Sequence, residues 1–321
     1  MSRKVFLTGA TGFVGNAVMR RLQVEGREVI AAVRKGGAEL PASVRSVSFT
    51  SFEHDNDWEG ALSECDVVVH SAARVHVMND TETDPLAAFR RVNVQGTVAL
   101  ARQAISAGVK RFVFISSIKV NGEGTKPGKP YTADDVPMPQ DPYGVSKMEA
   151  EEALRKLAAE SGLEVVIIRP VLVYGPGVKA NFLNMMRWLD RGVPLPFGAI
   201  DNRRSLVALD NLVDLIVTCI EHPAARNQTF LVSDGEDLST TALLRRMAQA
   251  LGKSARLLPV PAWVLSAGAK SLGKAALSQR LCGSLQVDIL KTRELLGWHP
   301  PVNVDAALLA AARRYQEQNK K

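Results

Sequence analysis

A tyrosine and a lysine four residues apart, Tyr143 and Lys147, are the side chains of this sequence best suited to acid–base chemistry. They lie in the segment DPYGVSK, where Asp141 and Pro142 are typical of a helix cap and first turn. On one face of a helix, the two side chains lie close together. A phenol with a pKa near ~10 exchanges protons poorly at neutral pH, and a nearby ammonium group favours its ionised form. The spacing therefore predicts a catalytic tyrosine assisted by a lysine.

Two further polar residues, Ser117 and Asn93, are expected near this pair. Ser117 ends the apolar run RFVFISS, and the carboxyl edge of a parallel sheet is where ligands bind in this class of fold. Its hydroxyl is suited to hydrogen-bond a substrate oxygen, whereas Ser116 points to the other face of the strand and is expected to be structural. Asn93 interrupts an apolar helical run. It is either a satisfied core amide or the holder of a water that relays protons to Lys147.

A glycine-rich turn, TGATGFVG, follows the first apolar run and opens a helix. Its glycines, Gly9, Gly12 and Gly15, allow a tight turn, a close approach of the backbone to a pyrophosphate, and close packing of helix on sheet. The spacing differs from G-x-G-x-x-G, in which one residue separates the first two glycines. At the first strand-to-helix junction of an alternating chain, the turn predicts a dinucleotide site.

Two basic residues, Arg34 and Lys35, end the second expected strand. NAD-selective proteins carry an acid there for the ribose 2′-hydroxyl, and NADP-selective proteins carry a base near the 2′-phosphate. We therefore expect NADP(H) to be favoured, with NAD(H) as the alternative. The competing interpretation is that both are exposed loop residues.

The elements that position these residues alternate along the chain. Apolar runs such as KVFLT, EVIAAV, DVVVHSA, RFVFISS and EVVIIRP are separated by helical stretches, one of them over roughly Pro85 to Ala107. This order predicts an α/β fold: a Rossmann-like, doubly wound parallel sheet of six or seven strands with a smaller C-terminal substrate-binding lobe. We assign residues 1–170, with about 203–234, to the NAD(P)-binding domain, and residues 171–202 and 235–321 to the lobe.

Composition excludes several classes of protein. The net charge of +7 comes from basic pairs spread along 321 residues without interleaved aromatics, so we expect no nucleic-acid partner. The three cysteines lie far apart without C-x-x-C spacing, which argues against disulfides and a metal site and suits a reducing cytoplasm. No run approaches the roughly 20 apolar residues of a transmembrane segment, and no signal peptide is expected at the start of the sequence.

Together these motifs resemble the extended short-chain dehydrogenase/reductase family, in particular its nucleotide-sugar branch, the NAD-dependent epimerase/dehydratase group. The resemblance covers nearly the whole chain, through TGATGFVG, VVHSAA, ISS, YGVSK, IIRPVLVYGPG, RRSLVALDNLVD and LLGWHPP. It implies that Ser117, Tyr143 and Lys147 form a catalytic triad, with Asn93 as its helper. By analogy with the family, the helices near Asn93 and Tyr143 form a homodimer interface.

The resemblance also implies binding residues. Expected cofactor contacts in the turn are Gly9, Thr11, Gly12, Phe13, Val14 and Gly15, and those around the nicotinamide and ribose are Ala72, Ala73, Tyr143, Lys147 and Pro170. Expected contacts to a UDP-sugar substrate are Ser117, Asn181, Phe182 and Arg204, with Arg204 at the diphosphate.

Within this branch, departures from the family patterns favour a reductase. Dehydratases carry an acidic pair after the catalytic serine, whereas this chain has Ile118 and Lys119. UDP-glucose 4-epimerases hold NAD through an acid after the second strand, which Arg34 and Lys35 do not match. The favoured hypothesis is reduction by NAD(P)H of the C4 keto group of a UDP-linked 4-keto-6-deoxy-N-acetylhexosamine, in the synthesis of bacterial surface polysaccharide such as O-antigen.

Three other functions stay open. One is a UDP-hexose or UDP-N-acetylhexosamine 4-epimerase that keeps NAD tightly bound, another is a reductase of a hydrophobic ketone, and the last is a non-catalytic cofactor-sensing protein. Residues 259–285, with Trp263, Lys270, Lys274 and Arg280 among small and apolar residues, form an amphipathic lid, a membrane-surface contact or a core helix. The core helix is the default expectation.

Overall fold

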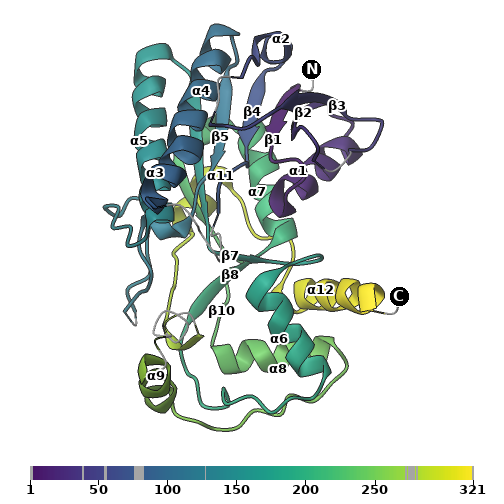
Figure 1. The fold of residues 1–321 in the computed structure, drawn as a ribbon, viewed down its shortest axis with the longest axis vertical. Helices are drawn as coiled ribbons and strands as arrows, with labels where there is room; N and C mark the ends of the chain where they lie inside the picture. Colours follow the sequence, from purple (N-terminus) through teal and green to yellow (C-terminus); the bar gives the residue numbers. More distant parts are fainter. Residues whose placement is uncertain are drawn as a thin grey trace.

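A seven-stranded sheet lies at the centre of the larger half of the molecule (Figure 1). The structure is a computed structural model that describes residues 3–37, 40–53, 56–75, 83–126, 128–271, 273, 279 and 281–319. In spatial order the strands are β3 (Arg45–Phe49), β2 (Val29–Arg34), β1 (Val5–Thr8), β4 (Val67–His70), β5 (Arg111–Ile115), β6 (Glu164–Pro170) and β9 (Thr229–Val232). All neighbours are parallel, and the order reverses between β1 and β4. The predicted Rossmann-like, doubly wound fold is confirmed.

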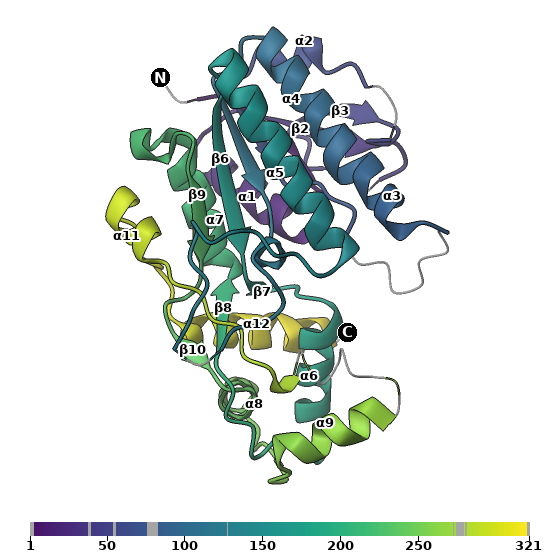
Figure 2. The ribbon, with the colours of Figure 1, turned by 90° about the vertical axis from the view of Figure 1, so that its left-hand side faces the viewer.

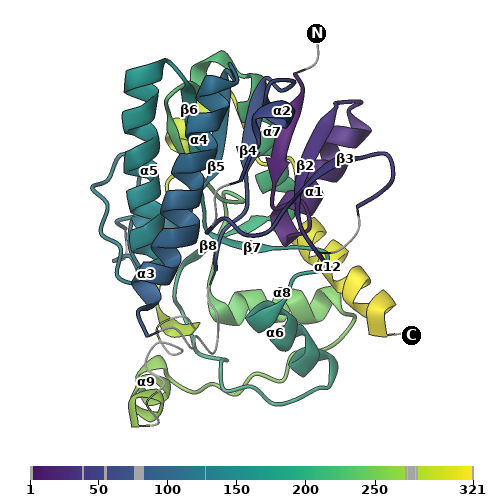
Figure 3. The same ribbon diagram turned by 45° about the horizontal axis from the view of Figure 1, so that its top comes forward.

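Helices cover both faces of this sheet, because successive strand residues point to opposite sides. One core includes Val5 and Leu7 of β1 and lies under α1 (Phe13–Val24), α7 (Leu209–Glu221) and α11 (Leu290–Leu296). The other includes Phe6 and lies under α2 (Glu59–Leu62), α4 (Gly96–Ser106) and α5 (Pro142–Ser161), which Figure 3 shows side by side on one face. Burial on both faces explains why the strands are continuous apolar runs.

The helix predicted over roughly Pro85 to Ala107 is present but changes its winding. It consists of α3 (Pro85–Arg90), the π-helical turn η1 (Arg91–Gln95) and α4. Asp84 caps its start by accepting a hydrogen bond from the Ala87 N–H (3.0 Å). Asn93 lies inside the π turn, a conformation that is frequent at functional sites.

The smaller half lies beyond the carboxyl ends of the large sheet (Figure 2). Its sheet has the order β10 (Asp237–Leu238), β8 (Arg204–Ala208) and β7 (Leu172–Tyr174), and a third core joins it to α6 (Ala180–Asp190), α8 (Thr240–Ala250) and α12 (Val304–Asn319). The range of about 203–234, expected in the larger domain, is divided. Its strand β8 pairs with β7 and β10 of the smaller sheet, whereas α7 and β9 belong to the larger half.

A buried carboxylate, Asp234, joins the two halves directly after β9. It accepts hydrogen bonds from the Tyr174 hydroxyl (2.8 Å), the Ala208 N–H (2.7 Å) and the Asn211 amide (2.7 Å). The same Asn211 amide bonds both backbone groups of Val302, which precedes α12. Asp234 and Asn211 together therefore connect the large sheet, the small sheet and the C-terminal segment.

The segment singled out at 259–285 contains α9 (Ala262–Ser271), none of whose residues is buried. The expectation of a core helix is therefore wrong for α9, because it packs no side chain into the interior. Lys274 and Arg280 lie outside the described residues. None of the helices in the described ranges combines the length and apolar character needed to cross a membrane.

Candidate active site

The glycine turn between β1 and α1 is closely packed backbone. Gly9 has φ of 76°, which favours glycine, and its carbonyl accepts a hydrogen bond from the Gly12 N–H (2.8 Å). A Cβ on Gly15 would lie 2.2 Å from the Gly9 oxygen, and a Cβ on Gly9 would lie 2.8 Å from the Ala72 nitrogen. Glycine is therefore required at both positions, and the loop holding Ala72 and Ala73 lies against the turn.

The start of α1 has the features of an anion site. Gly12 caps the helix without a side-chain hydrogen bond, and no acidic residue lies in the first turn. The first N–H groups of a helix, here those of Phe13, Val14 and Gly15, lie outside its hydrogen-bond ladder and favour a phosphate. Thr11 is exposed beside them. These residues fit the pyrophosphate of a nicotinamide dinucleotide.

Arg34 and Lys35 lie where the sequence places them, at the carboxyl end of β2, and both are exposed. The Lys35 N–H donates to the Phe49 carbonyl (2.8 Å), so the backbone here is fixed to β3. Both side chains are therefore accessible on the edge of the sheet that carries the glycine turn. This arrangement is compatible with the expected 2′-phosphate contact.

Ser117 and Tyr143 are joined by a side-chain hydrogen bond. Ser117 follows β5 and caps the short 3-10 helix η2 (Ile118–Val120), where it accepts a bond from the Lys119 N–H (3.2 Å). Tyr143 lies in the first turn of α5, which Asp141 caps through the Gly144 N–H (2.7 Å). Lys119 forms an ion pair with Asp141, so the position that is acidic in dehydratases here fastens the serine loop to the tyrosine helix.

Lys147 lies one turn further along α5 and is 1% exposed. Its ammonium donates to the Ile115 carbonyl (2.8 Å) and lies 4.4 Å from the centre of the Phe114 ring. Burial lowers the pKa of Lys147 to about 7, and the charge of Glu151 opposes that decrease. The structure thus brings Ser117 and Tyr143 into contact and places Lys147 beneath them on the same helix.

Burial raises the pKa of Tyr143 well above its ordinary value. The Asp141 carboxylate raises it further, and the hydrogen bond from Ser117 opposes both effects. The expected lowering of this pKa by Lys147 is not a feature of this structure, in which the groups that shift the pKa of Tyr143 are Asp141 and Ser117. The phenol is therefore protonated here and needs an additional positive charge before it ionises.

The side-chain amide of Asn93 is hydrogen-bonded to neighbouring groups of the protein. Its amide oxygen accepts a bond from the Arg74 N–H (2.8 Å), and its nitrogen donates to the Arg74 carbonyl and to the Ser146 hydroxyl (both 3.0 Å). Ser146 in turn donates to the Tyr143 carbonyl (2.8 Å). Of the two interpretations of the sequence, these contacts match the satisfied amide, and they connect the loop after β4 to the catalytic helix.

A buried histidine that the sequence analysis did not single out, His70, extends this connection. The Thr97 hydroxyl donates to the Asn93 carbonyl (2.7 Å), so it accepts the bond from His70 Nε2 (2.9 Å). Nδ1 is then the acceptor for the Thr8 hydroxyl (2.7 Å), whose oxygen accepts the Ala72 N–H (3.2 Å). Burial lowers the pKa of His70 to about 3, so the ring is neutral. This chain joins the glycine strand to Asn93.

A second group missed from the sequence lies under the serine loop. Glu151, fully buried, accepts bonds from the Ser116 hydroxyl (2.6 Å) and from the Arg169 guanidinium (2.9 and 2.6 Å). Arg169 also donates to the Asn121 amide oxygen (3.0 Å). The signal in the sequence was an arginine inside the apolar run EVVIIRP, since a buried charge requires a partner. The predicted structural role of Ser116 agrees with this contact.

The remaining predicted site residues lie at the boundary of the two halves or in the lobe. Pro170 is buried at the end of β6, and Asn181 is exposed in the first turn of α6, directly after Ala180, whose φ of 54° is strained. Phe182 is 2% exposed and stacks on Tyr174, with ring centres 5.3 Å apart. Its side chain belongs to the core of the lobe, so a substrate contact there would use backbone. Arg204 donates to the Gly283 carbonyl (3.0 Å).

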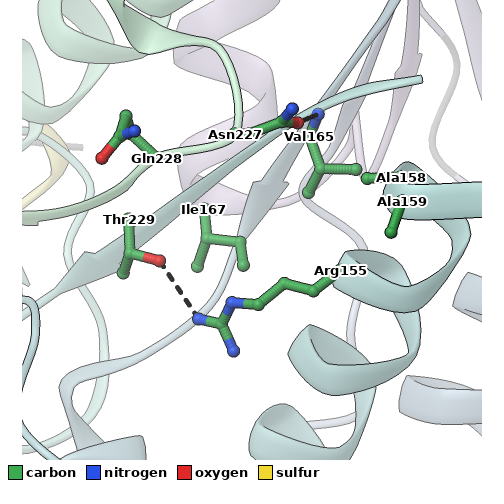
Figure 4. Close-up of a pocket in the computed structure, with 8 residues that line it drawn as sticks. All are labelled: Arg155, Ala158, Ala159, Val165, Ile167, Asn227, Gln228 and Thr229. Carbon is green, nitrogen blue, oxygen red and sulfur yellow. Dashed lines mark hydrogen bonds between the residues drawn. The ribbon is translucent and has the colours of Figure 1, made fainter. Parts of the chain in front are cut away.

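The cavity drawn in Figure 4, about 220 Å³, lies away from these residues, between the later turns of α5 and the strands β6 and β9. Arg155 crosses it and donates to the Thr229 hydroxyl (3.1 Å). Another cavity of similar volume is lined by Asp237 of β10 and Arg293 of α11, elements of the smaller and the larger half. The triad and the glycine turn line neither cavity. The candidate site is therefore identified by the types of its residues and by their contacts with one another.

The profile of the NAD dependent epimerase/dehydratase family matches residues 5–233. The chain belongs to this family. A relative from Vibrio cholerae, a UDP-glucose 4-epimerase, is 50% identical over 321 residues, which cover 99% of this chain and 97% of the relative.

Two solved structures are similar in fold to this member of the epimerase/dehydratase family. The UDP-glucose 4-epimerase of Thermotoga maritima, solved with UDP-glucose, has a TM-score of 0.79 at 23% identity and covers 98% of this chain and 99% of its own. The UDP-glucuronic acid 4-epimerase of Bacillus cereus, solved with NAD, has a TM-score of 0.78 at 20% identity, with coverage of 98% and 99%.

Membership of the epimerase/dehydratase family confirms the resemblance drawn from the motifs and the prediction of an NAD(P)-dependent enzyme. The family is described by its dependence on NAD, which agrees with a nicotinamide dinucleotide at the glycine turn. The preference for NADP(H) expected from Arg34 and Lys35 stays a prediction.

Proposed function

We propose that this protein is a UDP-hexose 4-epimerase that works with bound NAD. The observation that carries the proposal is the 50% identity to the Vibrio cholerae UDP-glucose 4-epimerase over nearly the whole of both chains. The epimerase, an alternative in the sequence analysis, thus replaces the 4-keto sugar reductase as the main hypothesis. The reductase becomes the second candidate, on the evidence of two exposed basic residues after β2.

In the proposed reaction, Tyr143 exchanges a proton with the C4 oxygen of the sugar. Ser117, already hydrogen-bonded to the phenol, holds the same oxygen and so keeps it within reach of Tyr143. NAD, when bound, supplies the acceptor and donor of the C4 hydride and a positive charge beside the phenol. Epimerisation requires the 4-keto sugar formed between the two steps to stay in the site and turn its other face to the returning hydride, while Tyr143 returns the proton to the C4 oxygen.

Lys147 sets the charge of the site in this proposal. Its pKa of about 7 means that a modest change in its surroundings moves it between the neutral and charged forms at physiological pH. A charged Lys147, held by the Ile115 carbonyl and the Phe114 ring, would favour the tyrosinate. We therefore assign to Lys147 the control of the Tyr143 proton, together with the expected contact to the cofactor ribose.

We propose that the larger half binds the dinucleotide and that the lobe, residues 171–202 and 235–321, binds the UDP-sugar. Two polar groups support this division: Asn181, exposed in the lobe, and the Arg204 guanidinium, which the strand β8 adds to the smaller sheet from outside these ranges. A homodimer through the helices near Asn93 and Tyr143, a cytoplasmic location and a role in O-antigen synthesis are further proposals, all by analogy with the family.

The deciding experiment is to incubate the purified protein with UDP-glucose and UDP-galactose separately, with no added cofactor, and to identify the sugars by chromatography. Interconversion, together with NAD released on denaturation, supports the epimerase. The opposite result is no interconversion, with consumption of added NADPH when a UDP-4-keto-6-deoxy sugar is supplied. That result would establish the reductase and would agree with Arg34 and Lys35 as 2′-phosphate contacts. Parallel incubation with UDP-N-acetylglucosamine tests whether the site accepts an acetamido group at C2.

A further inference from the structure

Basic pairs are spread along the whole chain, but the excess of basic over acidic residues lies in one segment. Residues 238–287 contain seven lysines and arginines and no aspartate or glutamate. The rest of the chain holds 33 basic and 33 acidic residues, so this segment alone accounts for the net charge of +7. An uneven distribution of this kind creates a positive field on one part of the surface.

The same segment contains an apolar helix, α9, with no buried residue. Trp263 and Val264 of this helix are 74% and 39% exposed. Leu258, just before the helix, is 51% exposed. All three views place α9 at the end of the lobe farthest from the large sheet (Figures 1, 2 and 3). Exposed apolar side chains gathered in this way mark an interaction surface.

A second stretch of chain extends this surface. Residues 191–200 run beside residues 256–261, with the Leu258 N–H donating to the Leu195 carbonyl and the Gly198 N–H to the Leu258 carbonyl (both 2.8 Å). The stretch contributes Arg191 and Val193, both exposed, and no acid before Asp201. We call this surface the α9 face; its exposed members are Arg191, Val193, Arg256, Leu258, Trp263, Val264 and Lys270.

Among the described residues, the ion pairs of residues 238–287 involve basic residues outside the α9 face. Arg246 bonds Glu236 and Asp305, and Lys253 lies 3.6 Å from Asp190. Within the described ranges, no ion pair involves Arg256 or Lys270. Interleaved cations and exposed apolar side chains, with a tryptophan among them, match the surface of an anionic lipid bilayer. Protein interfaces instead have an apolar centre from which lysine is depleted.

We propose that the α9 face docks this protein on membranes that contain anionic phospholipids. Trp263, Val264 and Leu258 enter the region of the headgroups, while Lys270, Arg256 and Arg191 contact lipid phosphates. The side chains of the triad and the glycine turn belong to other elements, so docking leaves the chemistry of the site unchanged. The inference is independent of which reaction the site performs.

The test is co-sedimentation of the full-length protein with vesicles of phosphatidylcholine alone, or of phosphatidylcholine with about a third phosphatidylglycerol. The protein should sediment with the anionic vesicles at about 0.1 M salt and be released at about 0.5 M, because salt screens exposed charges. Trp263→Asp should lower the partition coefficient by about tenfold or more. Lys270→Glu should lower it by about tenfold, since reversal changes two units of charge at the surface.

Matched controls test whether the loss of vesicle binding is specific to the α9 face or follows from any added negative charge on the surface. Val24→Asp also places a carboxylate at an exposed apolar position, 86% exposed at the end of α1, and Lys110→Glu reverses an exposed charge in the larger half. Both should bind anionic vesicles like the parent protein. Circular dichroism melting and turnover, which the variants should retain, establish that they are folded.

Three results would overturn the proposal. The first is failure to sediment with anionic vesicles, and the second is binding by Trp263→Asp as strong as that of the parent. The third is a change in KM or in molecular mass caused by Trp263→Asp. A raised KM would identify α9 as a lid over the substrate. A smaller species in sedimentation equilibrium would identify α9 as an interface between two copies of the chain.

Discussion

The phenol of Tyr143 lies in surroundings that oppose the chemistry proposed for it. Burial and the Asp141 carboxylate raise its pKa, and the hydrogen bond from Ser117 compensates only in part. Proton exchange near neutral pH requires the reverse, and the same helix carries a cationic group, Lys147, on its next turn. Ionisation of the Tyr143 phenol therefore depends on positive charge that the bound ligands supply.

Replacing Tyr143 by phenylalanine removes the proton donor and acceptor but keeps the ring that packs against Phe89, with ring centres 6.0 Å apart. We expect kcat to fall by about 10²–10⁴-fold, while the affinity for NADH, measured by fluorescence titration, is unchanged. Tyr315→Phe is the matched control, because that hydroxyl bonds Asp190 in the lobe (3.2 Å) and should be dispensable for turnover. Full activity of the Tyr143 variant would remove this residue from the mechanism.

Lys147 predicts a pH dependence of stability. Its folded pKa of about 7 is lower than the unfolded value of 10.5, so between these values the unfolded chain binds a proton that the folded chain does not. The free energy of unfolding should therefore rise with pH above about 7. Above about pH 9 the buried thiols of Cys65 and Cys219, whose pKa values burial raises, oppose the rise.

Urea unfolding of the cofactor-free protein between about pH 7 and 9 measures this dependence. Lys147→Met should remove most of the rise in that window, because it removes the titrating group and keeps an apolar stem of similar length. An equal slope in the parent and the variant would mean that Lys147 keeps its proton in the folded protein.

At the scale of single residues, spacing in the sequence was enough to predict which site residues lie together when they share a helix or follow a neighbouring strand. Tyr143, Lys147 and Ser117 were predicted in this way, and the structure places them together. The partners of Asn93 and Glu151 could not be predicted, because Arg74 and Arg169 reach them from other elements. Those contacts exist only once the sheet has formed.

At the scale of elements, α5 is held to the sheet by its buried acid. Glu151 bonds Arg169 of β6 and Ser116, the neighbour of Ser117. Glu151→Gln leaves the Arg169 guanidinium buried without a counter-charge, and we expect a loss of about 3–5 kcal/mol in the free energy of unfolding by urea. Some loss of kcat should accompany it, because the serine loop loses its anchor.

Arg155→Met is the control for that experiment. Its guanidinium contacts the same carboxylate (3.0 Å), but the side chain is 44% exposed, so the pair is screened by solvent. The expected loss is about 1 kcal/mol or less. Losses of equal size in the two variants would contradict the assignment of Arg169 as the essential partner.

The elements themselves were largely predictable from apolar runs and caps. The seven strands of the large sheet and the start of α5 agree with the sequence analysis. The π turn at Arg91–Gln95 was not predictable, because one additional residue per turn leaves hardly any trace in the periodicity of so short a helix. The default expectation for α9 was wrong, since apolar composition does not reveal whether another surface covers a helix.

At the scale of the molecule, the two halves are joined through Asp234, which receives three hydrogen bonds from β7, β8 and α7. Asp234→Ala would leave those donors buried without an acceptor, and we expect a loss on the order of 3 kcal/mol in the free energy of unfolding by urea. Asp210→Ala, an exposed acid at the start of α7, should cost far less. Similar losses of unfolding free energy in the two variants would show that Asp234 does not hold the two halves together.

Connections of this kind explain why the lobe was harder to predict than the large sheet. The strand β8 is separated from β7 in the sequence by α6 and a long loop. It pairs with β7, which precedes it in the sequence, and with β10, which follows it. Sequence order indicates neighbours in a repeating strand–helix pattern, but that pattern ends after β6. The division of residues 203–234 between the two halves depends on long-range pairing.

The hydrogen-bonded chain through His70 cannot conduct protons. It begins at a peptide N–H, that of Ala72, and ends at a peptide carbonyl, that of Asn93, and neither group gives up or takes a proton near neutral pH. Every hydrogen between them has one assigned direction, and reversing one would require reversing all. The chain of hydrogen bonds therefore has a structural role: through one neutral imidazole it fixes the separation of the glycine turn from the loop held by Asn93.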